Sequence, residues 1–432
     1  GRDELETITG LEELTAQQFF IEEQGKFRFR HDLIQQVVVD GLVPVRRQLL
    51  HRRAGYALEK SNPEAVTTLA YHFTKGNQPQ KAVQFHSLSA QGAEQLFAWQ
   101  EAERHQEHVL SLLDQMDPAY SQAECNQMRA QVLASRAHLR YLQGRMADRD
   151  QDLGLLDALA QTGTAEMRLT ALREKVRYLN LDSHYEKAIF EAQEGLNIAN
   201  QLGDHAAAAR LLEQIGFAHY LLGQPQHALT ALEAAMAMTD KDMDEVIRGH
   251  ISHILGYVHF HLANYSRALT YQQEAYTLHE GANDYNRMAW DGLDIGLLLL
   301  KIGRLPESKQ CLDDHVDLAR RIIARPPEAY GLTLIGIWHL YQGDYFKATK
   351  YFKHAFDLQI ELRSGQGSVA AESGMGLSLY HLGDVDIARQ WLESAANRAR
   401  SIVHRRRLVE ILVMRGLVEI SAAKFECAFE LL

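Results

Sequence analysis

Polar and aromatic side chains recur at a fixed interval of forty residues in the middle of the sequence. We consider one position of this pattern and the positions three and seven residues after it. In successive repeats these positions include Arg210, Glu213, His250, His253, Tyr257, Trp290 and Tyr330. Arginine and large aromatic residues are frequent anchors of binding surfaces. The chemistry that this set offers is therefore recognition, in which Arg210 would meet an acidic group of a ligand. Packing between helices is the alternative, and it accounts for Phe217 and Ile337.

The sequence contains 21 histidines, which raises the question of a metal site. His219, His259 and His339 share one position of the repeating pattern. Stacked helices lie about 8–10 Å apart, whereas a zinc ligand lies about 2 Å from its metal. His250 and His253 share one helix face, but the pattern offers them no third ligand. We therefore expect packed or solvated histidines and no bound metal.

Motifs for catalysis and for phosphate binding are missing from the sequence. It has no GxSxG nucleophile motif, and nothing else places a base beside a nucleophile. It also has no GxxxxGK[ST] phosphate loop. We expect no enzyme activity and no cofactor in this chain, so ATP or ADP would be bound only by a larger intact protein.

Composition excludes several classes of protein. The formal charge of −11 argues against general nucleic-acid binding by the whole chain. The three cysteines, Cys125, Cys311 and Cys427, lie far apart, which is typical of reduced thiols in the cytoplasm. No apolar run approaches the length of about 18 residues that a membrane span requires. We expect a cytoplasmic protein without a membrane partner.

Small residues at the same interval indicate the helices that position the recurring side chains. Four columns of mostly glycine, alanine or serine begin at Gly216, Gly223, Ala228 and Ala235, and each repeats every forty residues. Each repeat unit has two apolar stretches of helical spacing around a short break. We expect the small residues to lie where two helices cross. A single hairpin cannot bury its own apolar face, but stacked neighbours can.

This pattern resembles the tetratricopeptide repeat (TPR). The resemblance rests on Gly216, Tyr220, Gly223, Ala228 and Ala235, with Leu232 between the last two, and on their equivalents in later copies. The usual unit has about 34 residues, whereas this one has forty, as in the superhelical domains of large bacterial regulators. The resemblance implies an all-α fold, a right-handed superhelix of antiparallel helical hairpins whose first helices line a concave groove.

The first sixty residues do not follow the repeat. They predict a helix, a turn at Gly25, a short strand at Phe27 and Phe29, and a second helix with Asp32 as its N-cap. Such an arrangement is half of a winged helix. The basic cluster Arg46, Arg47, His51, Arg52 and Arg53 follows it, and we interpret this cluster as a solvated or interdomain face in preference to a nucleic-acid patch.

The stretches "FRFRHDLIQQVVVDGL" and "RRQLLHRRAGYALE", followed by loose hairpins and then repeats, resemble the winged-helix module and sensor of STAND-class signalling ATPases. LuxR-type and SARP-type bacterial transcriptional regulators belong to that class. The resemblance implies that His31 senses the β-phosphate of a bound ADP in the intact protein. The alternative is that His31 merely opens a helix.

The expected organisation has three parts. Residues 1–60 form a partial winged-helix module, residues 61–123 irregular helical hairpins, and residues 124–432 the TPR-like solenoid. The lack of an initiator methionine and of a polar final repeat suggests a piece of a larger protein that could self-assemble. We expect the sensor region of a STAND-class transcriptional regulator, which binds a protein, a peptide or a small-molecule inducer. The alternative is a free-standing scaffold that joins partner proteins without a nucleotide switch.

Overall fold

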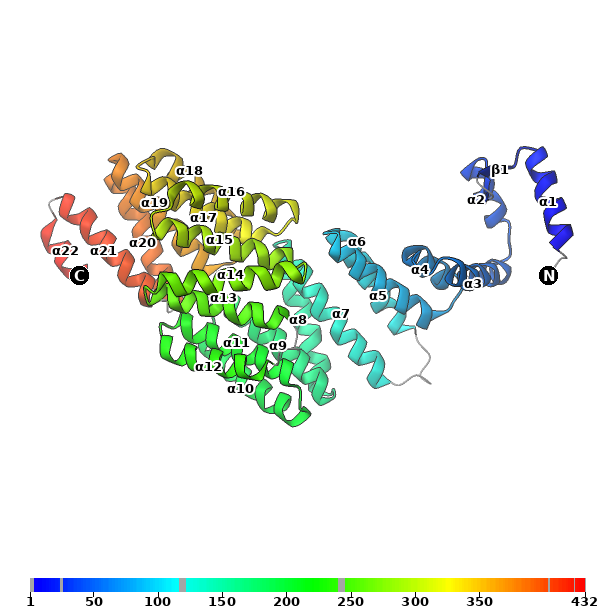
Figure 1. Ribbon diagram of the computed structural model, residues 1–432, viewed down its shortest axis with the longest axis horizontal. Helices are drawn as coiled ribbons and strands as arrows, with labels where there is room; N and C mark the ends of the chain where they lie inside the picture. Colours follow the sequence, from blue (N-terminus) through cyan, green and yellow to red (C-terminus); the bar gives the residue numbers. More distant parts are fainter. Residues whose placement is uncertain are drawn as a thin grey trace. The chain divides into compact units, whose positions relative to one another are not determined.

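A computed structural model describes residues 4–23, 26–115, 122–239, 245–402, 405–422 and 424–431 (Figure 1). The chain forms two compact units, residues 1–117 and residues 118–432. The described part is helical apart from one two-stranded sheet near the N-terminus. None of its helices combines the length and the apolar character needed to cross a bilayer.

The first unit begins with a helix, a β-hairpin and a helix. These elements are α1 (Glu4–Ala16), β1 (Phe20–Glu23), β2 (Lys26–Phe29) and α2 (Asp32–Asp40). The strands are antiparallel, and Phe20 lies opposite Phe29 with ring centroids 4.6 Å apart. The sequence predicted the strand at Phe27 and Phe29 but not its partner β1, and the predicted turn at Gly25 lies outside the described residues.

The predicted N-cap of α2 was wrong. Asp32 is the first residue of the helix, and His31 is its N-cap, without a side-chain hydrogen bond. The backbone of His31 is extended, with φ −133° and ψ 132°. Its carbonyl oxygen accepts hydrogen bonds from the backbone N–H groups of Ile34 and Gln35, which places the helix boundary one residue earlier than Asp32.

Four further helices complete the first unit. They are α3 (Pro44–Ser61), α4 (Val66–Lys75), α5 (Pro79–Gln95) and α6 (Trp99–Asp114). Proline in the first turn of α3 and α5 favours helix initiation, because that position needs no N–H donor. Phe73 of α4 is fully buried and stacks on Phe85 of α5 with ring centroids 5.4 Å apart. This contact joins α4 and α5 into one hairpin.

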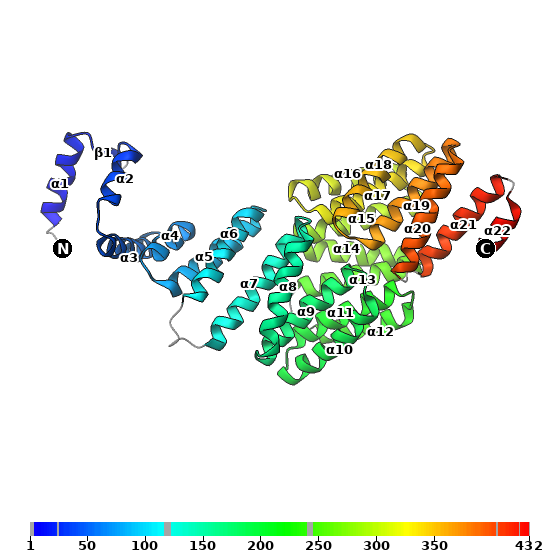
Figure 2. The same cartoon turned by 180° about the vertical axis from the view of Figure 1, so that it is seen from behind.

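The second unit is an array of antiparallel hairpins (Figure 2). Its first helices are α7 (Gln122–Leu142), α9 (Ala165–Leu181), α11 (His205–Leu221), α13 (Glu245–His261), α15 (Tyr285–Lys301), α17 (Arg325–Tyr341), α19 (Gly365–Leu382) and α21 (Arg405–Ser421). Its second helices are α8 (Met146–Gln161), α10 (Tyr185–Leu202), α12 (Pro225–Met238), α14 (Tyr265–Gly281), α16 (Leu305–Arg321), α18 (Tyr345–Glu361), α20 (Val385–Ser401) and α22 (Phe425–Leu431).

The first glycine column lies at the helix crossings, as predicted. A Cβ atom added at Gly216, Gly256, Gly296, Gly336 or Gly376 would approach within 2.6 to 2.8 Å of a side chain on the second helix of the same hairpin. At Gly336 that side chain is the fully buried Phe352. Real Cβ atoms do not approach other atoms so closely, so only glycine fits these crossings without displacement.

The second small-residue column has a different role from the predicted one. Gly223 has φ +74° and lies in the turn between α11 and α12, not at a helix crossing. Nothing lies within 4 Å of the position where its Cβ would be. Glycine recurs at this turn because the left-handed backbone conformation costs it least. Ala263, at the equivalent position, adopts the same conformation with φ +59°.

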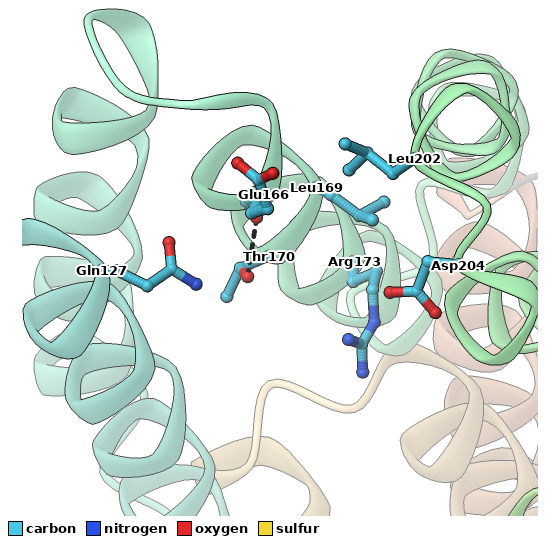
Figure 3. Close-up of a pocket in the computed structure, with 7 residues that line it drawn as sticks. All are labelled: Gln127, Glu166, Leu169, Thr170, Arg173, Leu202 and Asp204. Carbon is cyan, nitrogen blue, oxygen red and sulfur yellow. Dashed lines mark hydrogen bonds between the residues drawn. The ribbon is translucent and has the colours of Figure 1, made fainter. Parts of the chain in front are cut away.

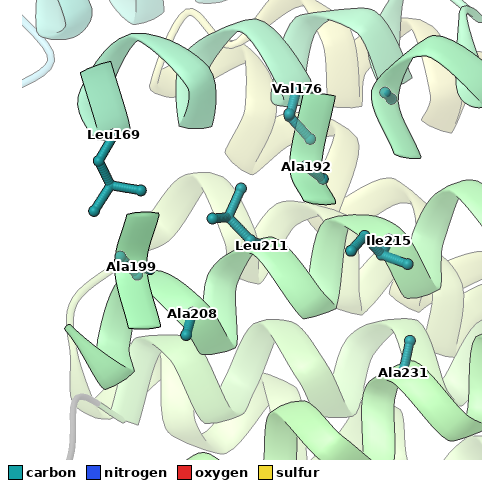
Figure 4. Close-up of a cluster of buried hydrophobic side chains, with 10 residues drawn as sticks. Leu169, Val176, Ala192, Ala199, Ala208, Leu211, Ile215 and Ala231 are labelled. Atoms are coloured by element: carbon teal, nitrogen blue, oxygen red, sulfur yellow. The ribbon is translucent and has the colours of Figure 1, made fainter. Parts of the chain in front are cut away.

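Alanines and branched residues of neighbouring hairpins share continuous cores. One such core joins residues of α9, α10, α11 and α12, namely Leu169, Val176, Ala188, Ala192, Ala199, Ala207, Ala208, Leu211, Ile215 and Ala231 (Figure 4). The small side chains let the helix backbones approach one another, and the larger ones fill the space between them. The expected all-α superhelix of stacked antiparallel hairpins is confirmed.

Hairpins that are distant in sequence also meet within this unit. Met146 of α8 is buried in one cluster with Leu332 of α17 and Leu358 of α18. Next to this cluster, Arg363 forms an ion pair of 2.8 Å with Asp150. The superhelix therefore turns far enough for the α7–α8 hairpin to contact the α17–α18 hairpin.

Candidate functional site

Trp290 of α15 and Tyr330 of α17 form an aromatic pair between neighbouring first helices. Their ring centroids are 5.3 Å apart and their planes are inclined by 30°. Both residues are half-buried. The predicted spacing of forty residues therefore brings the two rings together and leaves part of each accessible.

Beneath this pair lies the carboxylate of Asp294, which is 3 % exposed. Tyr330 donates a hydrogen bond of 2.8 Å to its Oδ1 atom. Its Oδ2 atom is buried and has no hydrogen-bond partner among the described residues. Burial raises the pKa of Asp294 to about 6, although His253, Tyr330 and Tyr257 lower it. Asp294 is therefore a buried acid that titrates near neutral pH.

A second buried acid, Asp291, joins two histidines. Its Oδ1 atom lies 2.6 Å from Nδ1 of His253 on α13, and its Oδ2 atom lies 2.6 Å from Nδ1 of His279 on α14. All three side chains are buried. Burial opposes charge on these groups, but their mutual contacts raise the pKa of His253 and lower the pKa of Asp291. This His–Asp–His network links three consecutive helices.

His250, one turn before His253, lies beside several arginines of first helices. Burial holds the pKa of His250 well below its usual value, and the positive charge of Arg287 is the next cause. Arg210 of α11 and Arg177 of α9 add smaller effects of the same sign. The ring of His250 also contacts that of His279, with centroids 5.1 Å apart. The positive charges of arginines on three first helices therefore act on one imidazole.

Glu213 of α11 is an acid within this group of cations. It is 4 % exposed and accepts a hydrogen bond of 2.9 Å from Nε2 of Gln214. Burial raises its pKa, while Arg287, Arg210 and Arg177 lower it. Because Glu213 is buried, it interacts with the charges of the arginines from inside the fold and offers little surface to a ligand.

Tyr257 of α13 belongs to a stack of rings. It lies parallel to Tyr220 of α11, with centroids 5.6 Å apart, and edge-on to His253 at 4.6 Å. Burial and the Asp294 carboxylate hold the pKa of Tyr257 well above its usual value. The ring stack thus connects α11 with the buried acids of α15.

We call the set Arg177, Arg210, His250, Arg287, Trp290 and Tyr330 the first-helix surface. Of the predicted residues, Arg210, His250, Trp290 and Tyr330 are half-buried members of it. His253 and Glu213 are buried beneath it and do not line an open groove. Sequence reasoning did not identify Asp291, Asp294, His279, Arg177 or Arg287. The signal for the two aspartates is the stretch "WDGLDIGLLLL", in which acids three residues apart interrupt an apolar helix.

The residues predicted near the N-terminus lie in the other unit. His31 is exposed at the start of α2. His51 of α3 is partly buried, and its Nδ1 atom lies 3.1 Å from Nδ1 of His72 on α4. Arg46, Arg52 and Arg53 carry no ion pair within the part of the chain that the structure describes. Among the described residues, no group of three or more histidine, cysteine or acidic side chains could hold a metal ion.

A cavity of 350 Å³ lies upstream of the first-helix surface (Figure 3). It is lined by Gln127 of α7, Glu166, Leu169, Thr170 and Arg173 of α9, Leu202 of α10 and Asp204 before α11. Arg173 occupies the same repeat position as Glu213, forty residues earlier. The cavity therefore includes a side chain at one of the predicted recognition positions of the repeat. It belongs to a repeat for which the sequence analysis predicted no site residue.

No family model matches this sequence, and no curated protein matches it. Solved structures do resemble it. A Rap protein complexed with Competence and Sporulation Factor is 13 % identical, with a TM-score of 0.54 over 79 % of this chain and 99 % of that chain. NprR in complex with its cognate peptide NprX is also 13 % identical, with a TM-score of 0.51 over 69 % of this chain and 87 % of that chain.

A STAND protein with a tetratricopeptide repeat sensor, from Pyrococcus horikoshii, is 13 % identical over 98 % of this chain and 57 % of that chain. Its TM-score of 0.40 supports no conclusion about this chain. The likeness to the Rap protein and to NprR concerns the path of the chain, because identities of 13 % do not carry a ligand from one protein to another. These comparisons identify the fold of the second unit as a TPR-like superhelix of helical hairpins.

Proposed function

We propose that the second unit is a sensor that binds an anionic peptide, or a small molecule of similar chemistry, on the first-helix surface. The observation that carries this proposal is that Arg177, Arg210 and Arg287 act together on His250 and Glu213, with Arg287 one turn before Trp290, whose ring stacks on Tyr330. Guanidinium groups recognise carboxylates, and stacked rings offer a rigid apolar platform. A ligand with an acidic end and an apolar body fits both features.

Electrostatics favour an anion at this place in particular. The chain as a whole carries a formal charge of −11, which repels anions over most of its surface. The first-helix surface contains three arginines, of which Arg177 forms an ion pair of 3.8 Å with Glu174, and the nearby Glu213 is buried beneath it. The positive potential of the arginines would therefore attract an anion that enters the superhelix. The Rap protein and NprR, which share this fold, were solved with bound partners, and this supports a peptide as the ligand.

The wider role that we propose is regulation of a STAND-class ATPase, in which the sensor controls a nucleotide-dependent switch of a transcriptional regulator. The α1–β1–β2–α2 segment would be part of the winged-helix module, and the exposed His31 would contact the nucleotide in the intact protein. Ligand binding to the second unit would shift the protein from an ADP-bound closed form to an active form. Effector domains would lie outside this chain.

The alternative is a scaffold that joins two proteins without a nucleotide switch. The exposed apolar side chains of α21, among them Val409 (61 % exposed) and Leu417 (52 %), favour this alternative, because apolar surface is a common feature of protein–protein contacts. The reading frame upstream of residue 1 separates the two roles. A phosphate loop encoded there supports the switch, and its absence supports the scaffold.

Panning a display library of short peptides with free C-terminal carboxylates against the chain tests the proposed binding. We expect enriched peptides with an apolar residue near an acidic group. Trp290→Ala should weaken their binding by about 2 kcal/mol, the loss typical of an interface anchor. Trp391→Ala is the matched control, because Trp391 is also half-buried but lies on the second helix α20, edge-on to Phe356. Enriched peptides that bind Trp290→Ala as well as the parent chain would overturn the proposal.

A further inference from the structure

The cavity between α7, α9 and the start of α11 has the composition of a site for a small zwitterion. Its volume of 350 Å³ is at the lower end of the range of about 300–1,000 Å³ that is typical of small-molecule sites. Its lining combines one cation, two acids, two polar neutral side chains and two leucines. The lining residues belong to hairpins upstream of the Trp290–Tyr330 pair, and none of them is a member of the first-helix surface.

The cation of this cavity, Arg173, is only partly compensated by the acids near it. Its guanidinium makes no ion pair or hydrogen bond to any residue that the structure describes. Burial lowers the pKa of Arg173, repulsion by Arg210 lowers it further, and Glu174 and Asp204 offset these effects only in part. A partly desolvated charge without a partner raises the free energy of the empty cavity. A carboxylate placed against Arg173 would remove this cost.

Gln127 of α7 lies across the cavity from Thr170 and Arg173 of α9 (Figure 3). Its Oε1 atom is buried and accepts no hydrogen bond from the described residues. An unsatisfied buried acceptor destabilises the empty cavity. An ammonium group in the cavity would donate to this oxygen, and the Nε2 atom of the same amide would donate to a carboxylate.

The acids of the cavity are Asp204 and Glu166. Asp204 is the N-cap of α11, and its Oδ1 atom accepts a hydrogen bond of 2.9 Å from the backbone N–H of Ala207. This bond leaves the other carboxylate oxygen for a ligand. Glu166 is exposed at the rim. The two negative charges oppose a simple anion in the cavity but favour a ligand that also carries an ammonium group.

Leu169 and Leu202 supply an apolar wall beside these charges (Figure 3). Leu169 is 4 % exposed and belongs to the core shared by α9 and α11, which holds it in place. Leu202, at the end of α10, is 39 % exposed and can cover a ligand from the solvent side. An aliphatic group of modest size would complete this wall.

We propose that this cavity binds a free α-amino acid with an aliphatic side chain. The carboxylate pairs with Arg173, the ammonium group binds Asp204 and the Gln127 amide oxygen, and the side chain packs on Leu169 and Leu202. A simple carboxylic acid lacks the group that satisfies Asp204, and an amine lacks the group that satisfies Arg173. The zwitterion alone satisfies both ends.

Isothermal titration calorimetry of the full chain with L-leucine tests this proposal. L-leucinamide, which lacks the carboxylate, and 4-methylpentanoate, which lacks the ammonium group, are the matched probes. We expect leucine to bind and each analogue to bind at least about tenfold more weakly, because each leaves one charged group of the cavity unpaired. The proposal fails if leucine gives no binding heat at millimolar concentration, or if either analogue binds as well as leucine.

Two variants assign the binding to this cavity. Arg173→Met should weaken leucine binding by at least about tenfold and should raise the melting temperature of the ligand-free chain, because it removes a desolvated charge. Arg168→Met is its control, since Arg168 is exposed on the same helix outside the cavity lining. Asp204→Asn keeps a good N-cap residue and should weaken leucine binding while sparing the fold. Unchanged leucine affinity in Arg173→Met and Asp204→Asn would place any binding elsewhere and overturn the proposal.

Discussion

The hydroxyl of Tyr330 on α17 donates a hydrogen bond of 2.8 Å to the buried carboxylate of Asp294 on α15. This bond joins neighbouring first helices directly beneath the stacked Trp290 ring. The other carboxylate oxygen, Oδ2, is buried without a hydrogen bond from the described residues and lies 3.7 Å from Nε2 of His253. The charged form of Asp294 is therefore disfavoured in the folded chain, so the free energy of unfolding depends on pH.

Asp294 should make the chain less stable as the pH rises from about 4 to about 6. Burial raises its pKa from 3.8 to about 6, so the folded state retains a proton that the unfolded state releases. The stabilising contribution is complete below the unfolded pKa and is lost as the pH rises through the folded one. A difference of this size corresponds to about 3 kcal/mol.

Urea unfolding of the parent chain and of Asp294→Asn at a series of pH values checks this expectation. Carboxylates distant from Asp294 affect both proteins alike, so the difference between the two reports on Asp294 and its interactions with His253 and Asp291. The stability of the variant relative to the parent should increase between pH 4 and pH 6 and stay constant above pH 7. A difference that does not vary with pH would mean that Asp294 keeps an ordinary pKa.

Gly336→Leu should destabilise the array by about 1–3 kcal/mol or more, because it overpacks a helix crossing. A Cβ atom there would lie 2.8 Å from the ring of Phe352, which is fully buried and cannot move aside. Gly256→Leu should also destabilise, since the side chain that it meets, Gln272, is buried and donates a hydrogen bond to the carbonyl oxygen of His253. Thermal unfolding measures both effects.

Gly154→Ala is the control for these substitutions. Gly154 lies within α8, is exposed, and has no atom within 4 Å of the position where its Cβ would be. Alanine should therefore stabilise the chain by up to about 1 kcal/mol through helix propensity. A melting temperature of Gly336→Leu equal to that of the parent would show that the glycine column is not needed at the crossings.

The spacing of residues in the sequence predicted the contacts that recur in every repeat, but not the contacts that depend on how the hairpins pack in space. Forty-residue spacing placed Trp290 beside Tyr330 and Gly336 at a crossing, because every hairpin repeats the same geometry. It could not separate the buried His253 from the half-buried His250, three residues earlier, since that depends on the partner Asp291 from the next hairpin. The contact of Met146 with Leu332 was also missed. It depends on the overall turn of the superhelix, which results from small rotations between neighbouring repeats and cannot be derived from the sequence of one repeat.

Arg287→Gln should raise the pKa of His250. Burial is the main cause of the depressed pKa of this histidine, and Arg287 is the first of the charges that add to it. The pKa of His259 provides an internal control, since it is depressed by burial and by Arg267. Proton NMR titration of the imidazoles should show that Arg287→Gln moves His250, together with His253 and His138, which Arg287 also affects, but not His259. Arg267→Gln should move His259 but not His250. A shift of both histidines in either variant would indicate a general change of structure.

Apolar packing, and not the ion pair, should hold the α7–α8 hairpin against the α17–α18 hairpin. Met146 is 3 % exposed and packs in one cluster with Leu332 and Leu358, so Met146→Ala should cost about 2–5 kcal/mol. The nearby ion pair between Arg363 and Asp150 has side chains 56 % and 44 % exposed. Solvent screens such a pair, so Arg363→Ala should cost at most about 1 kcal/mol.

Urea unfolding in low and high salt distinguishes the two contributions to this contact. The loss in Met146→Ala should be the same at both salt concentrations, because apolar burial does not depend on charge screening. The smaller loss in Arg363→Ala should shrink further in high salt, since dissolved ions screen exposed charges. If Arg363→Ala instead costs more than Met146→Ala in low salt, the superhelix is closed by charge, and the buried cluster around Met146 contributes little to the contact between these hairpins.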